Sequence, residues 1–236
     1  MNTKFLKSLL SAVFCTGLLV SVPAYATSST VLNFYGITNN DTTGAAVADG
    51  VANLRVKVID IGSDKVQFLF TNNSANSSLT DVYFNDGALL GISDVTYSNG
   101  VRFTGGSASP PNLPGGNSVS PAFQTTAGFL ADADSPPTKN GVQNSNVTGE
   151  WLAIDFLLKS GKTYADVLSA LTLPGNAPTD AAPWLRIGLH VQGFPVSSTT
   201  TVSESFINSP IPEPEAYAML LAGLGLVGFV ARRRKQ

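Results

Sequence analysis

Three segments of this sequence alternate apolar and polar residues, and this alternation constrains the fold more than any other feature. Apolar side chains recur at every second position in residues 54–58, 66–70 and 185–191. Because successive side chains of a β-strand point to opposite faces of a sheet, a period of two predicts strands with one buried face. Turn-forming residues at 60–64 join the first two segments, so residues 51–72 are predicted to form a β-hairpin.

The remaining elements follow from weaker patterns. Residues 151–158 are apolar at both parities apart from Asp155, which suits a central strand covered on both faces. Only residues 164–171 show the i, i+3, i+4, i+7 spacing of a helix, with Thr163 as its N-cap. Further strands are expected near 31–35, 80–84, 95–103 and 201–207. Seven or eight short strands with one helix predict an all-β fold, an antiparallel β-sandwich or jelly roll.

Two stretches rich in proline, glycine, serine and asparagine interrupt this pattern, at residues 105–121 and 131–149. Their composition predicts long exposed loops on either side of the more apolar residues 122–130. The Ser/Thr-rich residues 197–214 are expected to end in a stalk that leads toward the membrane.

The N-terminus reads as a cleaved secretory signal, residues 1–26. Two lysines precede an apolar stretch at 9–20, and Ala24 and Ala26 fit the small-x-small pattern that signal peptidase accepts. Cleavage is expected before Thr27. The mature protein is therefore predicted to be exported.

Cysteine and charge exclude several functions. Cys15 is the single cysteine and lies within the signal, so the mature chain has no disulfide, thiolate nucleophile or cysteine metal site. Residues 27–210 carry eight Lys and Arg against fourteen Asp and Glu. This acidic balance argues against a nucleic-acid partner, which would require a basic surface.

The C-terminus combines three parts in a fixed order. An uncharged run at 216–231 could form a helix of about 24 Å, short of the roughly 30 Å hydrocarbon core, and flanking basic side chains could extend it. Positive charge after the run predicts a cytoplasmic C-terminus and a body outside the inner membrane. The motif before the run is Pro212, Glu213 and Pro214; the basic residues after it are Arg232, Arg233, Arg234 and Lys235.

This order of parts resembles the PEP-CTERM sorting signal of Gram-negative bacteria. In that family an exosortase, a membrane cysteine protease, is believed to recognise the Pro-Glu-Pro segment, remove the helix and release or attach the body outside. Genes of the family accompany production of exopolysaccharide and biofilm matrix. Together with the patterns above, the resemblance leads us to expect three regions: signal peptide 1–26, extracellular β-sandwich 27–207, and sorting signal 208–236 with its transmembrane helix at 216–231.

Few residues suggest catalysis. His190 is the only histidine, and its outward strand position predicts a surface side chain. A Ser-His-Asp arrangement is formally open, but no G-x-S-x-G motif accompanies it. Glu150 and Glu204 are the only glutamates in residues 27–210, and a hydrolase could use either one.

Calcium is the one metal that the sequence could accommodate. Asp132 with Asp134, or Asp60 with Asp64, could join backbone carbonyls around Ca²⁺, although neither pair matches the EF-hand loop. No other cofactor is expected.

Aromatic residues suggest a binding role instead. Trp151 and Trp184 both sit at the polar parity of their strands, and with Tyr83 or Tyr97 they could form a platform that stacks on sugar rings. The alternative, favoured because Leu157 shares the face of Trp151, is a second buried face with the helix packed over it.

The leading expectation is therefore a non-enzymatic cell-surface or exopolysaccharide-matrix protein. An extracellular carbohydrate-binding module is the alternative, and a secreted hydrolase is the third reading.

Overall fold

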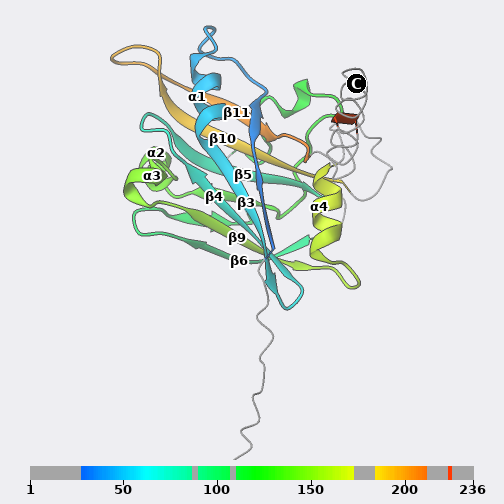
Figure 1. Ribbon diagram of the computed structural model, residues 1–236. Coiled ribbons are helices and arrows are strands. Elements are labelled where there is room, and N and C mark those ends of the chain that lie inside the picture. Colours follow the sequence, from blue (N-terminus) through cyan, green and yellow to red (C-terminus); the bar gives the residue numbers. More distant parts are fainter. Residues whose placement is uncertain (1–27, 87–89, 107–109, 173–183, 212–222, 225–236) are drawn as a thin grey trace, which may run out of the picture.

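The chain folds into two antiparallel β-sheets packed face to face, as predicted (Figure 1). The computed structural model describes residues 28–86, 90–106, 110–172, 184–211 and 223–224. In order across the sheet, sheet A consists of β1 (Ser29–Leu32), β3 (Leu54–Gly62), β4 (Lys65–Asn72), β9 (Leu152–Leu158) and β6 (Leu90–Tyr97). Sheet B consists of β2 (Phe34–Gly36), β11 (Thr201–Asn208), β10 (Leu185–Pro195), β5 (Ser78–Asp86), β8 (Leu130–Ala133) and β7 (Phe103–Gly105).

The strands with the clearest sequence patterns are confirmed. β3 and β4 form the predicted hairpin, in which Val58 pairs with Phe68 and both side chains are fully buried. β9 lies between β4 and β6, as expected for a central strand, but it is not covered on both faces, because Leu157 is 48% exposed. In the hairpin the buried parity is the one that the alternation predicted.

Aromatic side chains join the two sheets. Phe84 of sheet B makes edge-to-face contacts with Phe68 and Phe156 of sheet A. Its ring centroid lies 5.2 Å from that of Phe68 and 4.7 Å from that of Phe156. Edge-to-face contacts of this kind add to the free energy that burial itself contributes. Since residues 28–236 contain no cysteine, this core holds the sandwich together without a disulfide.

The predicted helix is confirmed as α4 (Tyr164–Thr172). Thr163 and Asp166 cap it reciprocally: the Asp166 N–H donates to Thr163 Oγ1 at 3.3 Å, and the Thr163 N–H donates to Asp166 Oδ2 at 2.7 Å. Hydrogen bonds from Thr163 lower the pKa of the Asp166 carboxyl. Val167 and Leu171 face inward and pack against the core at one end of the sandwich.

A second long helix, α1 (Ala45–Asn53), was not predicted. The Asp41 carboxylate accepts hydrogen bonds from the N–H groups of Gly44 and Ala46 at 2.9 and 2.8 Å and so caps the first turn. Gly50 lies directly against the ring of Phe206, where no Cβ would fit. The short helices are α2 (Pro137–Asn140), α3 (Ser145–Thr148) and the 3₁₀ turn η1 (Gly116–Ser118).

Two predicted strands are divided between the sheets. The strand expected near 31–35 is β1 in sheet A and β2 in sheet B, and the strand expected near 95–103 includes parts of β6 and β7. The chain thus crosses from one layer to the other within a few residues, which alternation alone does not reveal.

The two stretches predicted as exposed loops are exposed along much of their described length, but each is anchored to the body by a few buried residues. Leu113 is 4% exposed, and Val142 is fully buried and pairs with Leu79. Residues 131–149 also contain part of β8 and both short helices. Isolated apolar residues within polar sequence anchor these segments.

The predicted signal helix lies outside the described residues, as does the C-terminal helix at 216–231 apart from Gly223 and Leu224. Within the described part of the chain, no helix is both long enough and apolar enough to cross a membrane. The stalk expected in residues 197–214 is absent up to Ile211, because β11 occupies 201–208. Ile211 itself packs against the core, and its N–H donates to the carbonyl of Leu171 at 3.2 Å.

Candidate functional site

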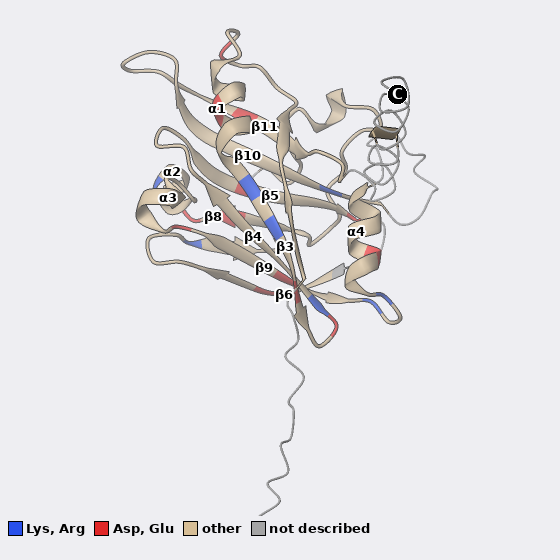
Figure 2. Cartoon of the chain, viewed as in Figure 1, with Lys and Arg blue, Asp and Glu red and all other residues tan. Residues whose placement is uncertain are grey.

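The two outer faces of the sandwich differ in what covers them. The outer face of sheet A is open and includes Lys57, which is exposed on β3 (Figure 2). The outer face of sheet B lies beneath residues 110–126, here called the covering segment. Leu113 and Phe123 of this segment pack with Tyr83, Leu130 and Ile207 of the sheet in a second hydrophobic cluster. The polar residues of sheet B are therefore enclosed.

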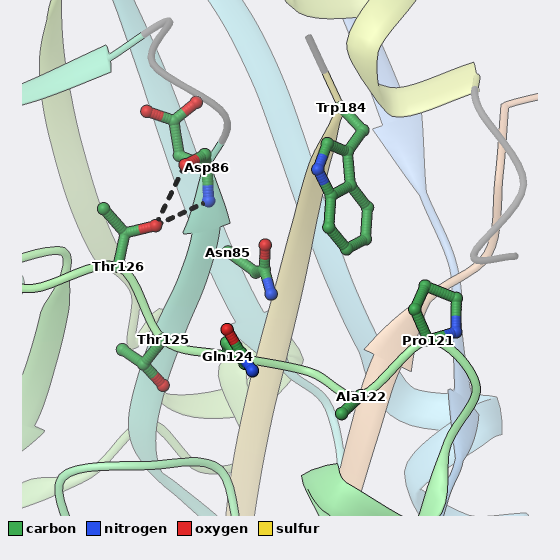
Figure 3. Close-up of a pocket in the computed structure, with 8 residues that line it drawn as sticks. All are labelled: Asn85, Asp86, Pro121, Ala122, Gln124, Thr125, Thr126 and Trp184. Carbon is green, nitrogen blue, oxygen red and sulfur yellow. Dashed lines mark hydrogen bonds between the residues drawn. The ribbon is translucent and has the colours of Figure 1, made fainter. Parts of the chain in front are cut away.

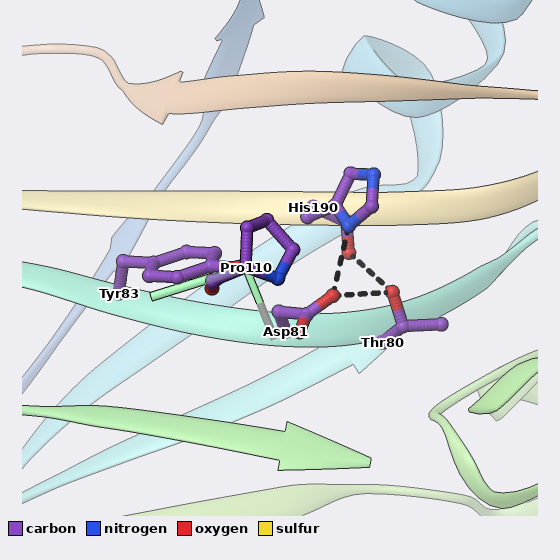
Figure 4. Close-up of polar contacts among 5 residues, drawn as sticks. All are labelled: Thr80, Asp81, Tyr83, Pro110 and His190. Carbon is purple, nitrogen blue, oxygen red and sulfur yellow. Dashed lines mark hydrogen bonds and ion pairs between the residues drawn. The ribbon is translucent and has the colours of Figure 1, made fainter. Parts of the chain in front are cut away.

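His190 is buried, not exposed as its outward position predicted. It lies on β10 opposite Asp81 of β5, and its Nδ1 is 2.9 Å from Asp81 Oδ2 (Figure 4). The Thr80 hydroxyl donates to the same carboxylate oxygen at 2.8 Å. Only 8% of His190 and 1% of Asp81 are exposed, because the neighbouring segments close over this part of the sheet.

Ser205 completes a row with this pair. It lies on β11 directly across from His190, so Ser205, His190 and Asp81 occupy three adjacent strands. The order resembles a serine hydrolase relay, in which a histidine oriented by an aspartate activates a hydroxyl. However, Ser205 Oγ is buried and has no hydrogen-bond partner among the described residues. A substrate would not reach it, so the row lacks an accessible nucleophile.

The two glutamates bind backbone N–H groups. Glu204 is fully buried, and its Oε1 accepts from the N–H groups of Asn40 and Asp41 at 2.6 and 3.2 Å. Glu150 Oε2 accepts from the N–H of Gln143 at 2.9 Å. Each carboxylate therefore holds a loop next to a different sheet.

The aspartates proposed for calcium serve turns and strand ends. Asp134 Oδ1 accepts from Thr104 Oγ1 at 2.9 Å, and Asp60 Oδ1 accepts from the N–H of Gly62 at 3.0 Å. No three His, Cys, Asp or Glu residues within the described ranges are grouped so that they could hold a metal ion.

The tryptophans predicted as a sugar platform lie far apart. Trp151 precedes β9, whose Leu152 pairs with Phe70 near the end of β4, whereas Trp184 precedes β10, whose Leu185 pairs with the end of β5. These positions are on different sheets and at opposite ends of the sandwich, separated by about 27 Å along a nine-residue strand. The pair therefore cannot form one platform.

Neither candidate tyrosine joins Trp184. Tyr83 is fully buried beneath the covering segment, where its hydroxyl donates to the carbonyl of Pro110 at 3.0 Å (Figure 4). Burial raises the pKa of Tyr83, and the negative charges of Asp81 and Asp132 raise it further. Tyr97 is 40% exposed but belongs to β6 in sheet A.

Arg186 fastens the covering segment to sheet B. Its guanidinium lies 4.2 Å from the centroid of the Trp184 ring and 5.2 Å from that of Phe123. Its two terminal nitrogens donate to the carbonyls of Pro121 and Ala122 at 2.8 and 2.6 Å. Burial lowers the pKa of Arg186 to about 10, so it remains a cation at neutral pH. A second buried face thus exists on sheet B, where a loop covers it instead of the predicted helix. The face on which burial was predicted from Leu157 is open, since Leu157 is 48% exposed.

A pocket opens beside the contact between Arg186 and the covering segment. It has a volume of about 330 Å³ and lies between the end of β5, the start of β10 and the covering segment (Figure 3). Trp184 is 7% exposed and Asn85 is 6% exposed, whereas Gln124 at the rim is exposed. Asn85 and Gln124 were not predicted, because single amides in polar sequence carry no recognisable pattern. The lining residues are Asn85, Asp86, Pro121, Ala122, Gln124, Thr125, Thr126 and Trp184.

Comparison with known protein families identifies the C-terminal segment. A family model described as the PEP-CTERM protein-sorting motif matches residues 210–235. The chain carries a PEP-CTERM sorting signal. This signal implies export to the cell envelope or extracellular space and sorting by an exosortase. The motif residues Pro212, Glu213 and Pro214 and the basic residues 232–235 all fall within the match.

The sandwich itself has no such counterpart. Neither a curated protein nor a solved structure matches the chain. The activity of the body therefore has to be argued from its own residues.

Proposed function

We propose that this protein is a non-enzymatic component of the cell surface or exopolysaccharide matrix, delivered there through its PEP-CTERM signal. The sorting motif at residues 210–235 is the observation that carries the proposal. The predicted signal peptide at the other end of the chain supports the same route, because export across the inner membrane must precede sorting.

The state of the ionisable residues supports a non-enzymatic role. His190 is hydrogen-bonded within a buried row, and both glutamates bind backbone N–H groups. A general acid or base has to reach its substrate, and these groups are already engaged in the fold. The mature sequence also contains no cysteine nucleophile.

The proposed processing has three steps. Signal peptidase reads Ala24 and Ala26 and cleaves before Thr27. The run at 216–231 then anchors the chain transiently in the inner membrane, with the basic residues 232–235 on the cytoplasmic side. Finally the exosortase recognises Pro212, Glu213 and Pro214 and removes the anchor.

Intact-mass spectrometry of the protein recovered from cells and from culture medium tests this proposal. We expect a species that starts at Thr27 and ends near residues 212–214. Glu213→Gln should cause the unprocessed tail to accumulate, whereas Glu215→Gln, just outside the triplet, should be processed normally. A wild-type protein that retains residues 232–236 would contradict the proposed sorting.

A further inference from the structure

We infer that the pocket beside Trp184 binds an uncharged sugar residue. The inference rests on the proposed function, because it names the class of ligand that the exported body would meet outside the cell. It concerns one small pocket and not the shared two-tryptophan platform, which the structure excludes.

The first argument is that polar groups without partners converge on one cavity. The Asn85 carboxamide points into the pocket although Asn85 is only 6% exposed (Figure 3). Within the described residues, neither this amide nor the indole N–H of Trp184 has a hydrogen-bond partner. Thr125 Oγ1, in the same wall, is buried and also lacks one.

The second argument is energetic. A buried polar group without a hydrogen bond costs about 1–3 kcal/mol, and buried tryptophans usually find a partner for the indole N–H. Thr125 Oγ1 is such a buried group, and it is readily explained if a ligand in the space of about 330 Å³ supplies the missing partner; the Asn85 carboxamide and the Trp184 indole N–H are open to the same ligand. This volume lies at the lower end of small-ligand sites, which suits a single small ligand or the end of a longer chain.

The lining chemistry selects the ligand class. Carboxamides can both donate and accept, which matches hydroxyl groups that do the same. Trp184 adds apolar surface of the kind that packs against the C–H groups of a sugar ring. Arg186 does not line the pocket, and its terminal nitrogens are committed to Pro121 and Ala122. An anionic ligand would therefore find no free cation in the wall.

The site is also held in place. Arg186 stacks on Trp184 from behind, and its two hydrogen bonds fix the covering segment at the edge of the pocket. A wall that is fixed before the ligand arrives lowers the entropy lost on binding. The other unpartnered buried atoms of sheet B are Ser78 Oγ, Asp81 Oδ1, Arg186 Nε and Ser205 Oγ; their residues line none of the described pockets and carry no comparable inference.

Tryptophan fluorescence can test the inference directly. The protein has two tryptophans, so Trp151→Phe leaves Trp184 as the single reporter. This variant, recovered as processed by the cells that express it, would be titrated with glucose, galactose, mannose, N-acetylglucosamine and their β-linked disaccharides. We expect a saturable change in Trp184 emission with at least one of these sugars.

Two variants and a matched control locate the binding. Gln124→Ala, at the exposed rim, and Asn85→Ser should each weaken binding about tenfold, as expected for one lost hydrogen bond. Asn117→Ala changes an exposed amide of the same segment that lines only the neighbouring hollow, which shares Gln124 and Thr125 with the pocket, and it should leave the affinity unchanged. Circular dichroism on each variant confirms that the fold is retained.

The inference is overturned if no sugar in the panel gives a saturable response, or if Gln124→Ala binds as the parent does. Neither result would contradict the proposed sorting, because processing is tested separately by mass spectrometry. Conversely, saturable binding by a protein that retains residues 232–236 would support the pocket and contradict the sorting.

Discussion

The two outer faces of this sandwich teach what alternation can and cannot predict. Both are formed by the polar parity of their strands, and both carry charged residues. On sheet A, Lys57 is exposed and Leu157 is 48% exposed. On sheet B, Arg186 and His190 are only 4% and 8% exposed, and the covering segment contacts Arg186 directly. Period two thus assigns a residue to a face, whereas a distant loop decides whether that face meets water.

The largest expected effect tests whether the covering segment behaves as core. Phe123→Ala removes a ring that is 2% exposed and should lower the free energy of unfolding by about 4 kcal/mol. Leu157→Ala on the open face should change it by less than about 0.5 kcal/mol. Urea unfolding of both variants measures the difference. Equal effects would mean that the covering segment contributes no more than an exposed loop.

A smaller loss of stability is expected when a glycine on each outer face is replaced by valine. A Cβ added at Gly188 would lie 2.7 Å from Leu113 Cδ2 and 2.9 Å from Phe123 Cζ, whereas one added at Gly91 would meet nothing within 4 Å. Gly188→Val should therefore destabilise the protein by about 2 kcal/mol through overpacking. Gly91→Val should be neutral to within about 0.5 kcal/mol, because its face is open. Thermal unfolding of the pair checks this, and a neutral Gly188→Val would show that the covering segment lifts away at little cost.

The smallest loss of stability is expected from a substitution at Asp166, which lies in α4 and on neither outer face. Hydrogen bonds from Thr163 lower the pKa of Asp166 in the folded protein, so its ionised form contributes stability at neutral pH. That contribution is lost as the pH falls through the lowered pKa. Asp166→Asn should therefore lower Tm slightly at pH 7, and the difference from the parent should shrink as the pH falls below the ordinary aspartate pKa of 3.8. A difference that grows in acid would contradict this origin.

Much of the fold follows from local sequence patterns. The β3–β4 hairpin and β10 can be recognised because the spacing of their apolar residues matches the pleat of a strand, and β9 because it is a continuous apolar run. α4 is recognisable because Thr163 caps a run with helical spacing. These patterns are local in sequence, although β9 and β10 pair with strands that are distant in sequence.

The missed features depend on contacts that no local window contains. α1 packs on Phe206 through Gly50, and nothing in the alanine-rich sequence around residue 50 indicates that partner. His190 was expected at the surface because of its outward strand position, and no local pattern indicates its partner Asp81, which is 109 positions away. Leu113 and Phe123 are single apolar residues in polar stretches, so their role as anchors appears only when the segment closes over sheet B.

Only part of the candidate site could be predicted from the sequence, for the same reason. Trp184 was proposed as a binding residue because it sits at the polar parity of its strand, and it does line the pocket. The prediction that Trp151 and Trp184 form one platform was wrong, because the order of strands in the sheets, and not the spacing in the sequence, decides which residues lie together. Asn85 pairs in register with Arg186, which places an amide beside the contact between this arginine and the covering segment only once β5 and β10 are adjacent.

The absence of a stalk before the sorting motif has a steric consequence. β11 ends at Asn208, the Ser209 N–H donates to the carbonyl of Asn33 at 2.8 Å, and Ile211 is packed against the core. Even if residues 209–211 came free, three residues would reach at most about 11 Å. A protease that reads Pro212, Glu213 and Pro214 must therefore approach almost to the surface of the folded sandwich. The shape of that end, with α4 beside the exit of the chain, is part of what the protease has to accommodate.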